Sequence, residues 1–225
     1  MNELEPQQVA RIGANLDAVR GRIAAACQRV GRDPREVRLL PVSKTHPPQA
    51  LLAAHAAGIS RFGENRVQEL VAKAELLDPA LGIEFALIGP LQSNKAGRAV
   101  QWAVEFQALD SLKLAANLDR RLQALGRSLG VLVEVNTSGE PTKHGLAPQD
   151  VPGFAAELAA FDSLKMRGLM TVAVLSSDAE QVAGCFRALR ELRDRLRDDQ
   201  GAGSDWPELS MGMSGDFELA IEHGA

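Results

Sequence analysis

Side chains suited to aldehyde and phosphate chemistry directly follow apolar segments of this 225-residue chain. Lys44 comes after the largely apolar residues 37–43, and Ser214 follows another apolar segment that ends at Met211. An unprotonated lysine amine attacks an aldehyde to form a Schiff base. Backbone N–H groups beside glycines, such as Gly212 and Gly215, bind phosphate groups. Lys44 is therefore the candidate nucleophile, and residues 212–216 form the candidate anion site.

Both residues also have ordinary structural explanations. A lysine after a strand is usually a solvated loop residue, and a serine before a helix is usually its N-cap. Partial desolvation at the mouth of a barrel would favour the free amine of Lys44, and the apolar segment before it supports this interpretation. The spacing does not separate capping from phosphate binding for Ser214. Asp216 must point away from any phosphate bound there.

Other polar and sulfur-containing side chains follow the remaining strands. Asn65 could donate a hydrogen bond to a ligand or cap the next helix, and capping is the more common role of such a residue. Met170, Met211 and Met213 are most simply core residues. One of these three could instead pack against a flat ligand ring.

The elements that must position these residues alternate regularly along the chain. Period-two and apolar segments predict strands at residues 37–43, 59–63, 84–88, 104–109, 131–136, 165–170 and 208–211. Amphipathic segments predict helices at residues 9–30, 48–57, 67–74, 94–100, 111–125, 148–160, 178–197 and 214–222. This alternation favours a parallel sheet covered by helices, with its ligand site at the carboxyl ends of the strands.

A closed (β/α) barrel needs eight strands, and the pattern contains seven. The sequence ends where an eighth strand would begin, so we expect either an open barrel or a recorded sequence that is cut short. An open doubly wound sheet is the structural alternative. The length fits one domain over residues 1–225.

Composition limits the classes of partner. The formal net charge is −4 and the isoelectric point is about 5.6, which gives no reason to expect nucleic acid or an anionic membrane. Cys27 and Cys185 lie within amphipathic helical patterns and are expected to be buried thiols. No metal-ligand spacing and no apolar segment of membrane-spanning length occur in the sequence. We expect a cytoplasmic monomer.

Six stretches of the chain, taken in order, carry a family resemblance. They are Val-Ser-Lys-Thr at 42–45, Phe-Gly-Glu-Asn at 62–65, Ile-Gly-Pro-Leu-Gln-Ser-Asn-Lys at 88–95, Asn136 with Glu140, Lys143 and Gly145, Met-Arg-Gly-Leu-Met at 166–170, and Leu-Ser-Met-Gly-Met-Ser-Gly-Asp at 209–216. The chain thereby resembles the pyridoxal 5'-phosphate (PLP) homeostasis protein family, whose fold is similar to the N-terminal domain of alanine racemase. The resemblance implies a single (β/α)8 TIM-like barrel with an extra N-terminal helix, from which the last strand is absent here.

The resemblance also implies a role for each matching position. Lys44 would hold PLP as a Schiff base, and Asn65 would approach the cofactor ring or its 3-hydroxyl. Met170 would line the ring face, while Met213 and Ser214 would hold the phosphate by backbone and hydroxyl. Such proteins bind PLP and influence vitamin B6 and amino-acid balance without strong catalytic activity. Apo PLP-enzymes are the protein partners that this role suggests.

The chain departs from the family pattern in three places. Ala86 stands where a histidine is usual, and Pro41 removes a backbone donor from the first predicted strand. The family continues beyond position 225 with a strand that carries Arg-Ile-Gly and contacts the pyridine nitrogen and the phosphate. Without that strand, we expect weaker cofactor affinity.

Two enzymatic alternatives remain open. A PLP-dependent amino-acid racemase needs an acid–base group on each face of its substrate, and related racemases supply one as a tyrosine from a second domain. This chain has no tyrosine, and His46 and His144 are its nearest substitutes. A PLP-independent aldolase would use Lys44 directly on a carbonyl substrate. Visible absorbance separates the two, because a bare lysine is colourless.

Overall fold

The computed structural model describes residues 6–200 and 206–225, and in these residues strands and helices alternate as expected. The strands are β1 (Arg61–Glu64), β2 (Glu84–Leu87), β3 (Ala103–Leu109), β4 (Leu129–Glu134), β5 (Leu164–Met170) and β6 (Glu208–Ser210). The helices are α1 (Pro6–Arg29), α2 (Pro48–Ala56), α3 (Val67–Leu76), α4 (Ala96–Trp102), α5 (Leu112–Leu125), α6 (Val151–Leu158), α7 (Ala179–Gln200) and α8 (Phe217–Glu222).

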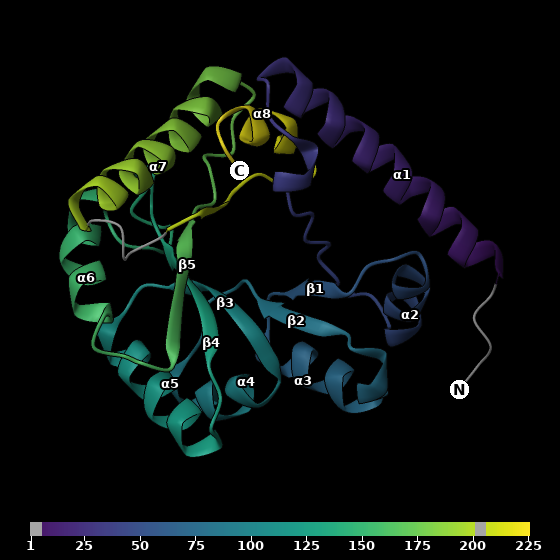
Figure 1. Ribbon diagram of the computed structural model, residues 1–225, viewed down its shortest axis with the longest axis horizontal. Coiled ribbons are helices and arrows are strands. Elements are labelled where there is room, and N and C mark those ends of the chain that lie inside the picture. The colour runs from purple at the N-terminus through teal and green to yellow at the C-terminus, as the bar shows by residue number, and fades with distance from the viewer. Residues whose placement is uncertain (1–5, 201–205) are drawn as a thin grey trace.

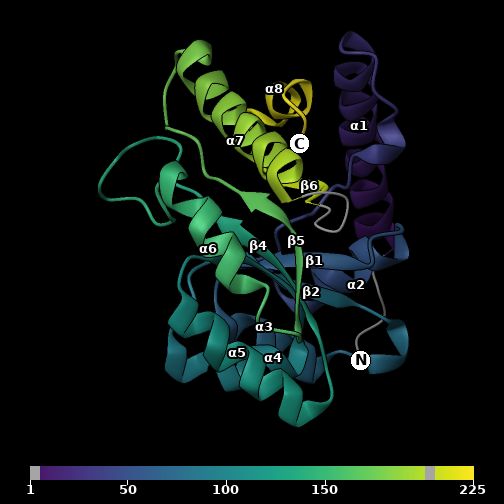
Figure 2. The same cartoon turned by 60° about the vertical axis from the view of Figure 1, so that its left-hand side comes forward.

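The six strands form one parallel sheet in the order β1-β2-β3-β4-β5-β6. The sheet curls like part of a barrel, and α3, α4 and α5 lie along its outer side (Figures 1 and 2). Helix α1 lies over the side on which the curl stays open (Figure 1). This is an incomplete TIM-like barrel of the expected kind, with an additional N-terminal helix.

The predicted strand at residues 37–43 is wrong over most of its length. The segment makes an isolated parallel bridge between Val42 and Gly63. In this bridge the Gly63 N–H donates to the Pro41 carbonyl at 2.8 Å, and the Ser43 N–H donates to the Gly63 carbonyl at 2.9 Å. Pro41 has no N–H to extend the ladder, so residues 37–40 run beside the sheet without joining it.

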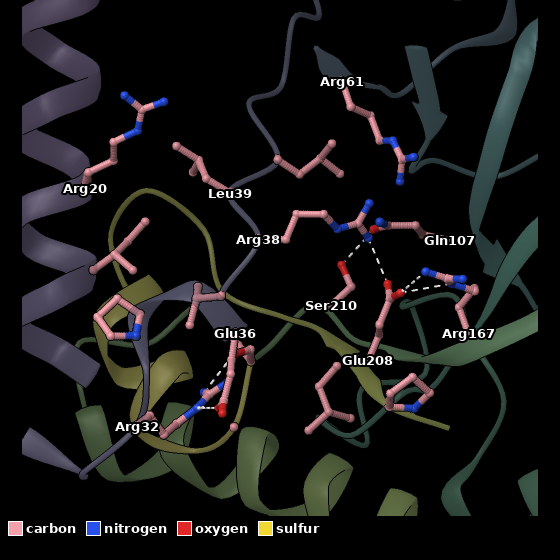
Figure 3. A pocket seen from close by; sticks show the side chains of 18 of the residues that line it. Arg20, Arg32, Glu36, Arg38, Leu39, Arg61, Gln107, Arg167, Glu208 and Ser210 are labelled. Carbon is pink, nitrogen blue, oxygen red and sulfur yellow. Dashed lines mark hydrogen bonds and ion pairs between the residues drawn. The ribbon is translucent and has the colours of Figure 1, made fainter. Parts of the chain in front are cut away.

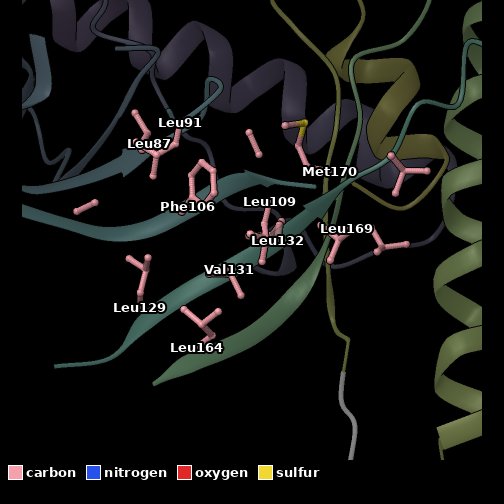
Figure 4. Close-up of a cluster of buried hydrophobic side chains, with 14 of the residues drawn as sticks. Leu87, Leu91, Phe106, Leu109, Leu129, Val131, Leu132, Leu164, Leu169 and Met170 are labelled. Carbon is pink, nitrogen blue, oxygen red and sulfur yellow. The ribbon is translucent and has the colours of Figure 1, made fainter. Parts of the chain in front are cut away.

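Buried apolar side chains on both faces of the strands form the core. Phe106, Leu132 and Leu169 are completely or almost completely buried, and Figure 4 shows them within one apolar cluster along the sheet. Cys27 and Cys185 are buried free thiols, as expected. No helix within the described residues is long and apolar enough to cross a membrane.

Ion pairs fasten α1 to α8. Arg22 donates two hydrogen bonds of 2.8 Å to the carboxylate of Glu218 and lies 4.4 Å from the centroid of the Phe217 ring. Arg29 donates to Glu222 at 2.6 Å. Helix α8 directly follows the candidate anion site at residues 212–216. The ion pairs from α1 to α8 therefore also help to hold that turn in place.

Candidate cofactor site

The fold brings all five expected site residues to one edge of the sheet. The strands are parallel, so their carboxyl ends meet at the same edge. Lys44 and Asn65 lie at the β1 end of that edge, and Met170 ends β5. Met213 and Ser214 follow β6, the last strand of the curl. The amine and the candidate phosphate turn therefore approach the site from opposite ends of the sheet.

Lys44 occupies a sharp turn at this edge. The His46 N–H donates to the Ser43 carbonyl at 3.0 Å, and Thr45 has a φ of 65°. Lys44 itself is exposed, so the expectation that its amine is partly desolvated is wrong for this structure. The turn directs the chain away from the sheet and leaves the amine accessible.

Asn65 lies at the end of β1 with its side chain exposed. It does not cap the following helix, because the N-cap residue of α3 is Arg66. The backbone carbonyl oxygen of Asn65 faces Gly89, and a Cβ atom at position 89 would lie only 2.4 Å from it. Glycine at position 89 thus allows the loops after β1 and β2 to touch, and the Asn65 amide stays at the rim.

Met170 is the last residue of β5 and is 5% exposed. Its carbonyl accepts a hydrogen bond from the Val135 N–H at 2.8 Å. Its side chain belongs to the same buried apolar cluster as Leu109 and Leu169 (Figure 4). The sulfur therefore lies below the rim rather than on the surface.

The candidate anion turn differs from the expected helix start. Helix α8 begins at Phe217 and its N-cap is Asp216, so the expectation that Ser214 caps the helix is wrong. The Asp216 Oδ1 accepts a 2.5 Å hydrogen bond from the Met213 N–H. Within residues 6–200 and 206–225, no hydrogen bond uses the N–H of Ser214 or Gly215. These two amides and the Ser214 hydroxyl are the donors left for an anion.

The loop after β4 is fixed to the segment after β5. Lys143 Nζ donates to the Ala173 carbonyl at 2.7 Å and lies 2.9 Å from a carboxylate oxygen of Glu140. The Asn136 side chain donates to the Glu140 carbonyl at 2.9 Å. These bonds hold the middle of the rim in place.

Glu134 is a titratable group at the end of β4 and is 9% exposed. Burial raises the pKa of its carboxyl to about 7, the charge of Asp110 adds to this rise, and His144 opposes it. Part of the Glu134 population is therefore protonated at neutral pH. Glu134 was not among the site residues expected from the sequence, although a carboxylate at the end of a buried strand was a visible signal.

A buried cluster beneath Lys44 was also missed. Lys73 Nζ lies 2.5 Å from Glu64 Oε1 and donates to the Ser43 carbonyl at 2.6 Å. Glu64 is completely buried, and the Lys73 side chain is 8% exposed. The available signal was the position of Lys73 on the apolar stripe of α3, three residues after Leu70 and one before Ala74.

A cavity of about 1300 Å³ opens between residues 37–40 and β6. None of the five expected site residues lines it. Figure 3 shows Arg38 crossing this cavity, where it donates to Glu105 at 2.9 Å and to Glu208 at 2.8 Å. The cavity is therefore separate from the candidate cofactor site and is crossed by an ion-pair network.

The curled parallel sheet and its polar carboxyl edge define the class of the protein. The family model described as "Alanine racemase, N-terminal domain" matches residues 14–225. A solved alanine racemase from Streptomyces coelicolor has the same fold, with a TM-score of 0.67 at 17% identity over 93% of this chain and 55% of that one. The chain is a barrel domain of this class.

Within this class, the chain belongs to the pyridoxal phosphate homeostasis protein family. The Pseudomonas aeruginosa protein of that name is 41% identical over 218 residues, which cover 96% of this chain and 91% of the relative. The structure of PipY from Synechococcus elongatus with PLP bound superposes with a TM-score of 0.83 at 36% identity. That match covers 95% of this chain and 94% of PipY.

Proposed function

We propose that this chain binds PLP through a Schiff base on Lys44 and acts in intracellular PLP homeostasis. The observation that carries the proposal is the exposed Lys44 amine at the same sheet edge as the unused donors of Ser214 and Gly215. An accessible amine and a cluster of anion donors match the aldehyde and phosphate of PLP. The name of the Pseudomonas aeruginosa relative and the PLP-bound structure of PipY support the same cofactor.

Each residue has a proposed part in holding the cofactor. PLP would supply an electrophilic aldehyde, and Lys44 would hold it through its side-chain amine. Asn65 would donate a hydrogen bond to the ring or its 3-hydroxyl, and Met170 would lie against the ring face. Ser214 would bind the phosphate by its hydroxyl and backbone. The Met213 N–H donates to the Asp216 carboxylate in this structure. With the cofactor bound, it would donate to the phosphate instead.

We propose further that the chain has no strong catalytic activity and passes PLP to apo PLP-enzymes. The exposure of Lys44 supports transfer, because a partner protein can reach the amine that holds the cargo. We expect it to act as one cytoplasmic domain and as a monomer. The monomer is checked by light scattering during size-exclusion chromatography, with and without PLP.

A PLP-dependent racemase is the second candidate, and Glu134 favours it. A carboxyl with a pKa of about 7 is suited to proton transfer near neutral pH. Racemisation needs an acid–base group on each face of the substrate, and the chain lacks tyrosine. Alanine racemisation assays on the parent protein and on Glu134→Gln test this candidate. A racemase requires that the parent protein is active and that the variant loses this activity.

The visible spectrum of the purified protein tests the proposed function. We expect the parent protein to be yellow with added PLP and Lys44→Ala to be colourless. Lys165→Ala is the matched control, because Lys165 is an exposed lysine near the opposite, amino-terminal end of β5. A parent that stays colourless with excess PLP would refute the proposal and favour the PLP-independent aldolase.

A further inference from the structure

We infer that Lys73, Glu64 and Glu69 are positioning residues that fix the orientation of Lys44, an inference that rests on the proposed function. The three residues lie on β1 and α3, directly beneath the turn that carries Lys44. Glu64 and Lys73 are buried, and Glu69 is partly exposed. They act on the cofactor lysine through the backbone of its neighbours.

Hydrogen bonds hold the residues on both sides of Lys44. The Ser43 carbonyl accepts from Lys73 Nζ at 2.6 Å, and the Ser43 hydroxyl donates to Glu64 Oε1 at 2.5 Å. On the other side, the Thr45 N–H donates to Glu69 Oε2 at 3.0 Å. The backbone before and after Lys44 is therefore bonded to charged side chains of β1 and α3.

The conformation of Thr45 shows that this turn depends on its surroundings. Thr45 is the only non-glycine residue in the described part of the chain with a positive φ, at 65°. A β-branched residue avoids this left-handed region unless neighbouring contacts impose it. The bond from its N–H to Glu69 is such a contact, and it fixes the direction in which the Lys44 side chain leaves the turn.

The chemistry of the buried pair points to positioning rather than to stability. Glu64 is completely buried, and its Oε2 atom has no hydrogen-bond partner within the described residues. Burying charges is costly, and apolar residues of similar size often replace a buried ion pair without loss of stability. Apolar residues could not donate to the Ser43 carbonyl. The pair thus supplies a bond next to Lys44 that hydrophobic packing cannot supply.

The double variant Glu64→Leu with Lys73→Met separates positioning from stability. It removes both charges together and leaves neither partner buried alone. We expect a melting temperature equal to or above that of the parent protein. We also expect PLP capture, followed by the growth of visible absorbance, to slow about tenfold or more because Lys44 is no longer held in a productive orientation.

Glu69→Ala is a second, milder variant that keeps the buried pair intact. Glu69 is partly exposed, so its removal does not threaten folding. We expect its PLP capture to slow several-fold. Gln68→Ala is the matched control on the same helix, since Gln68 is exposed and its side chain donates no hydrogen bond to the turn.

Amide hydrogen exchange of the cofactor-free proteins gives a readout that does not need PLP. The Thr45 amide should exchange about tenfold faster in Glu69→Ala than in the parent and Gln68→Ala. Unchanged exchange together with unchanged PLP capture in both variants would overturn the inference. A parent protein that fails to bind PLP would instead refute the proposed function, so the two failures are distinguishable.

Discussion

At the scale of single residues, the site contains a reactive group that is accessible and an acid that is not. Lys44 is exposed, while the Glu134 carboxyl at the same sheet edge is almost completely buried. Burial favours the neutral form of Glu134, and the nearby Asp110 carboxylate strengthens this preference. The rim of the site thus contains a group whose charge changes close to neutral pH.

The raised pKa of Glu134 predicts a pH-dependent change in stability. Its carboxyl has a pKa of about 7 in the folded protein, against about 4.3 in an unfolded chain. The folded state binds the extra proton between these values, so this residue lowers stability as the pH rises through that interval. Glu134→Gln lacks this titration and should gain melting temperature relative to the parent between pH 5 and pH 8.

Thermal melts at several pH values measure the effect of Glu134→Gln. Glu191→Gln, an exposed change on α7, is the control and should follow the parent at every pH. A difference in melting temperature between the parent and Glu134→Gln that is the same at pH 5 and pH 8 would contradict the raised pKa of the Glu134 carboxyl.

At the scale of elements, the pairing of β5 with β6 carries the candidate phosphate turn. Gly168 pairs with Glu208 in this parallel register. A Cβ atom at position 168 would lie 1.8 Å from the Glu208 carbonyl oxygen, so only glycine allows the two strands to approach. The position of residues 212–216 depends on this contact, because they directly follow β6.

Gly168→Ala should therefore destabilise the protein by about 3 kcal/mol, since backbone rather than a flexible side chain opposes the added methyl group. Gly153→Ala is the matched control. A Cβ atom there meets nothing within 4 Å, and alanine within helix α6 should stabilise by about 0.5–1 kcal/mol. Denaturant titration of both variants checks the contrast, which equal stabilities would contradict.

The sequence predicted the alternation of elements well but not the pairing of every segment. Six predicted strands appear within a few residues of their expected limits, because apolar periodicity reflects burial directly. The strand predicted at residues 37–43 was wrong over most of its length, because a strand needs hydrogen bonds to a partner and Pro41 has no N–H to donate. The helix expected from Ser214 begins at Phe217, since Asp216 bonds to the Met213 N–H and closes a turn first.

The site was partly predictable for a related reason. Residues that follow strands, such as Lys44 and Asn65, are recognisable from sequence because parallel strands bring their carboxyl ends together. Lys73 and Glu64 were missed, because their contacts join a helix to a strand and to the turn after residue 42. The role proposed for Lys73 and Glu64 depends on their burial and on the distances between their side chains and the Lys44 turn. A local sequence pattern predicts neither.

At the scale of the whole molecule, a charged network joins the two ends of the curled sheet. Arg38 lies in the segment beside β1 and binds both Glu105 on β3 and Glu208 on β6. Glu105 also accepts from Arg61 of β1 at 3.0 Å, and Arg167 of β5 binds Glu208 at 2.7 Å. The bonds of Arg38 and Arg61 connect segments that are not neighbours in the sheet, whereas the Arg167 bond joins the adjacent strands β5 and β6.

Glu105 is the centre of this network and carries a pH prediction of its own. Burial acts to raise the pKa of its carboxyl, but hydrogen bonds from Arg38 and Gln107 and the charges of Arg38 and Arg61 outweigh it, so the pKa lies below its usual value. A lowered carboxyl pKa stabilises the folded state above the unfolded pKa of about 4.3, and this stabilisation is lost as the pH falls through the folded value.

Glu105→Gln should lower the free energy of unfolding at pH 7 by about 2–3 kcal/mol, because it leaves Arg38 without its most buried partner. The deficit should shrink as the pH falls below about 4. Glu36→Gln is the control, since the Glu36 side chain is exposed and its 3.7 Å pair with Arg32 contributes little. A deficit that stays constant down to pH 3 would contradict this account of the network.

Covalent trapping identifies the lysine that holds PLP, which we propose to be Lys44. Borohydride reduction of the PLP-loaded protein converts a Schiff base into a stable amine, and peptide mass spectrometry then locates it. We expect a pyridoxyl phosphate group on the peptide that contains Lys44. The label should be lost from that peptide in Lys44→Ala and retained in the Lys165→Ala control. Label concentrated on Lys143, or spread over exposed lysines with Lys44 unmodified, would contradict it.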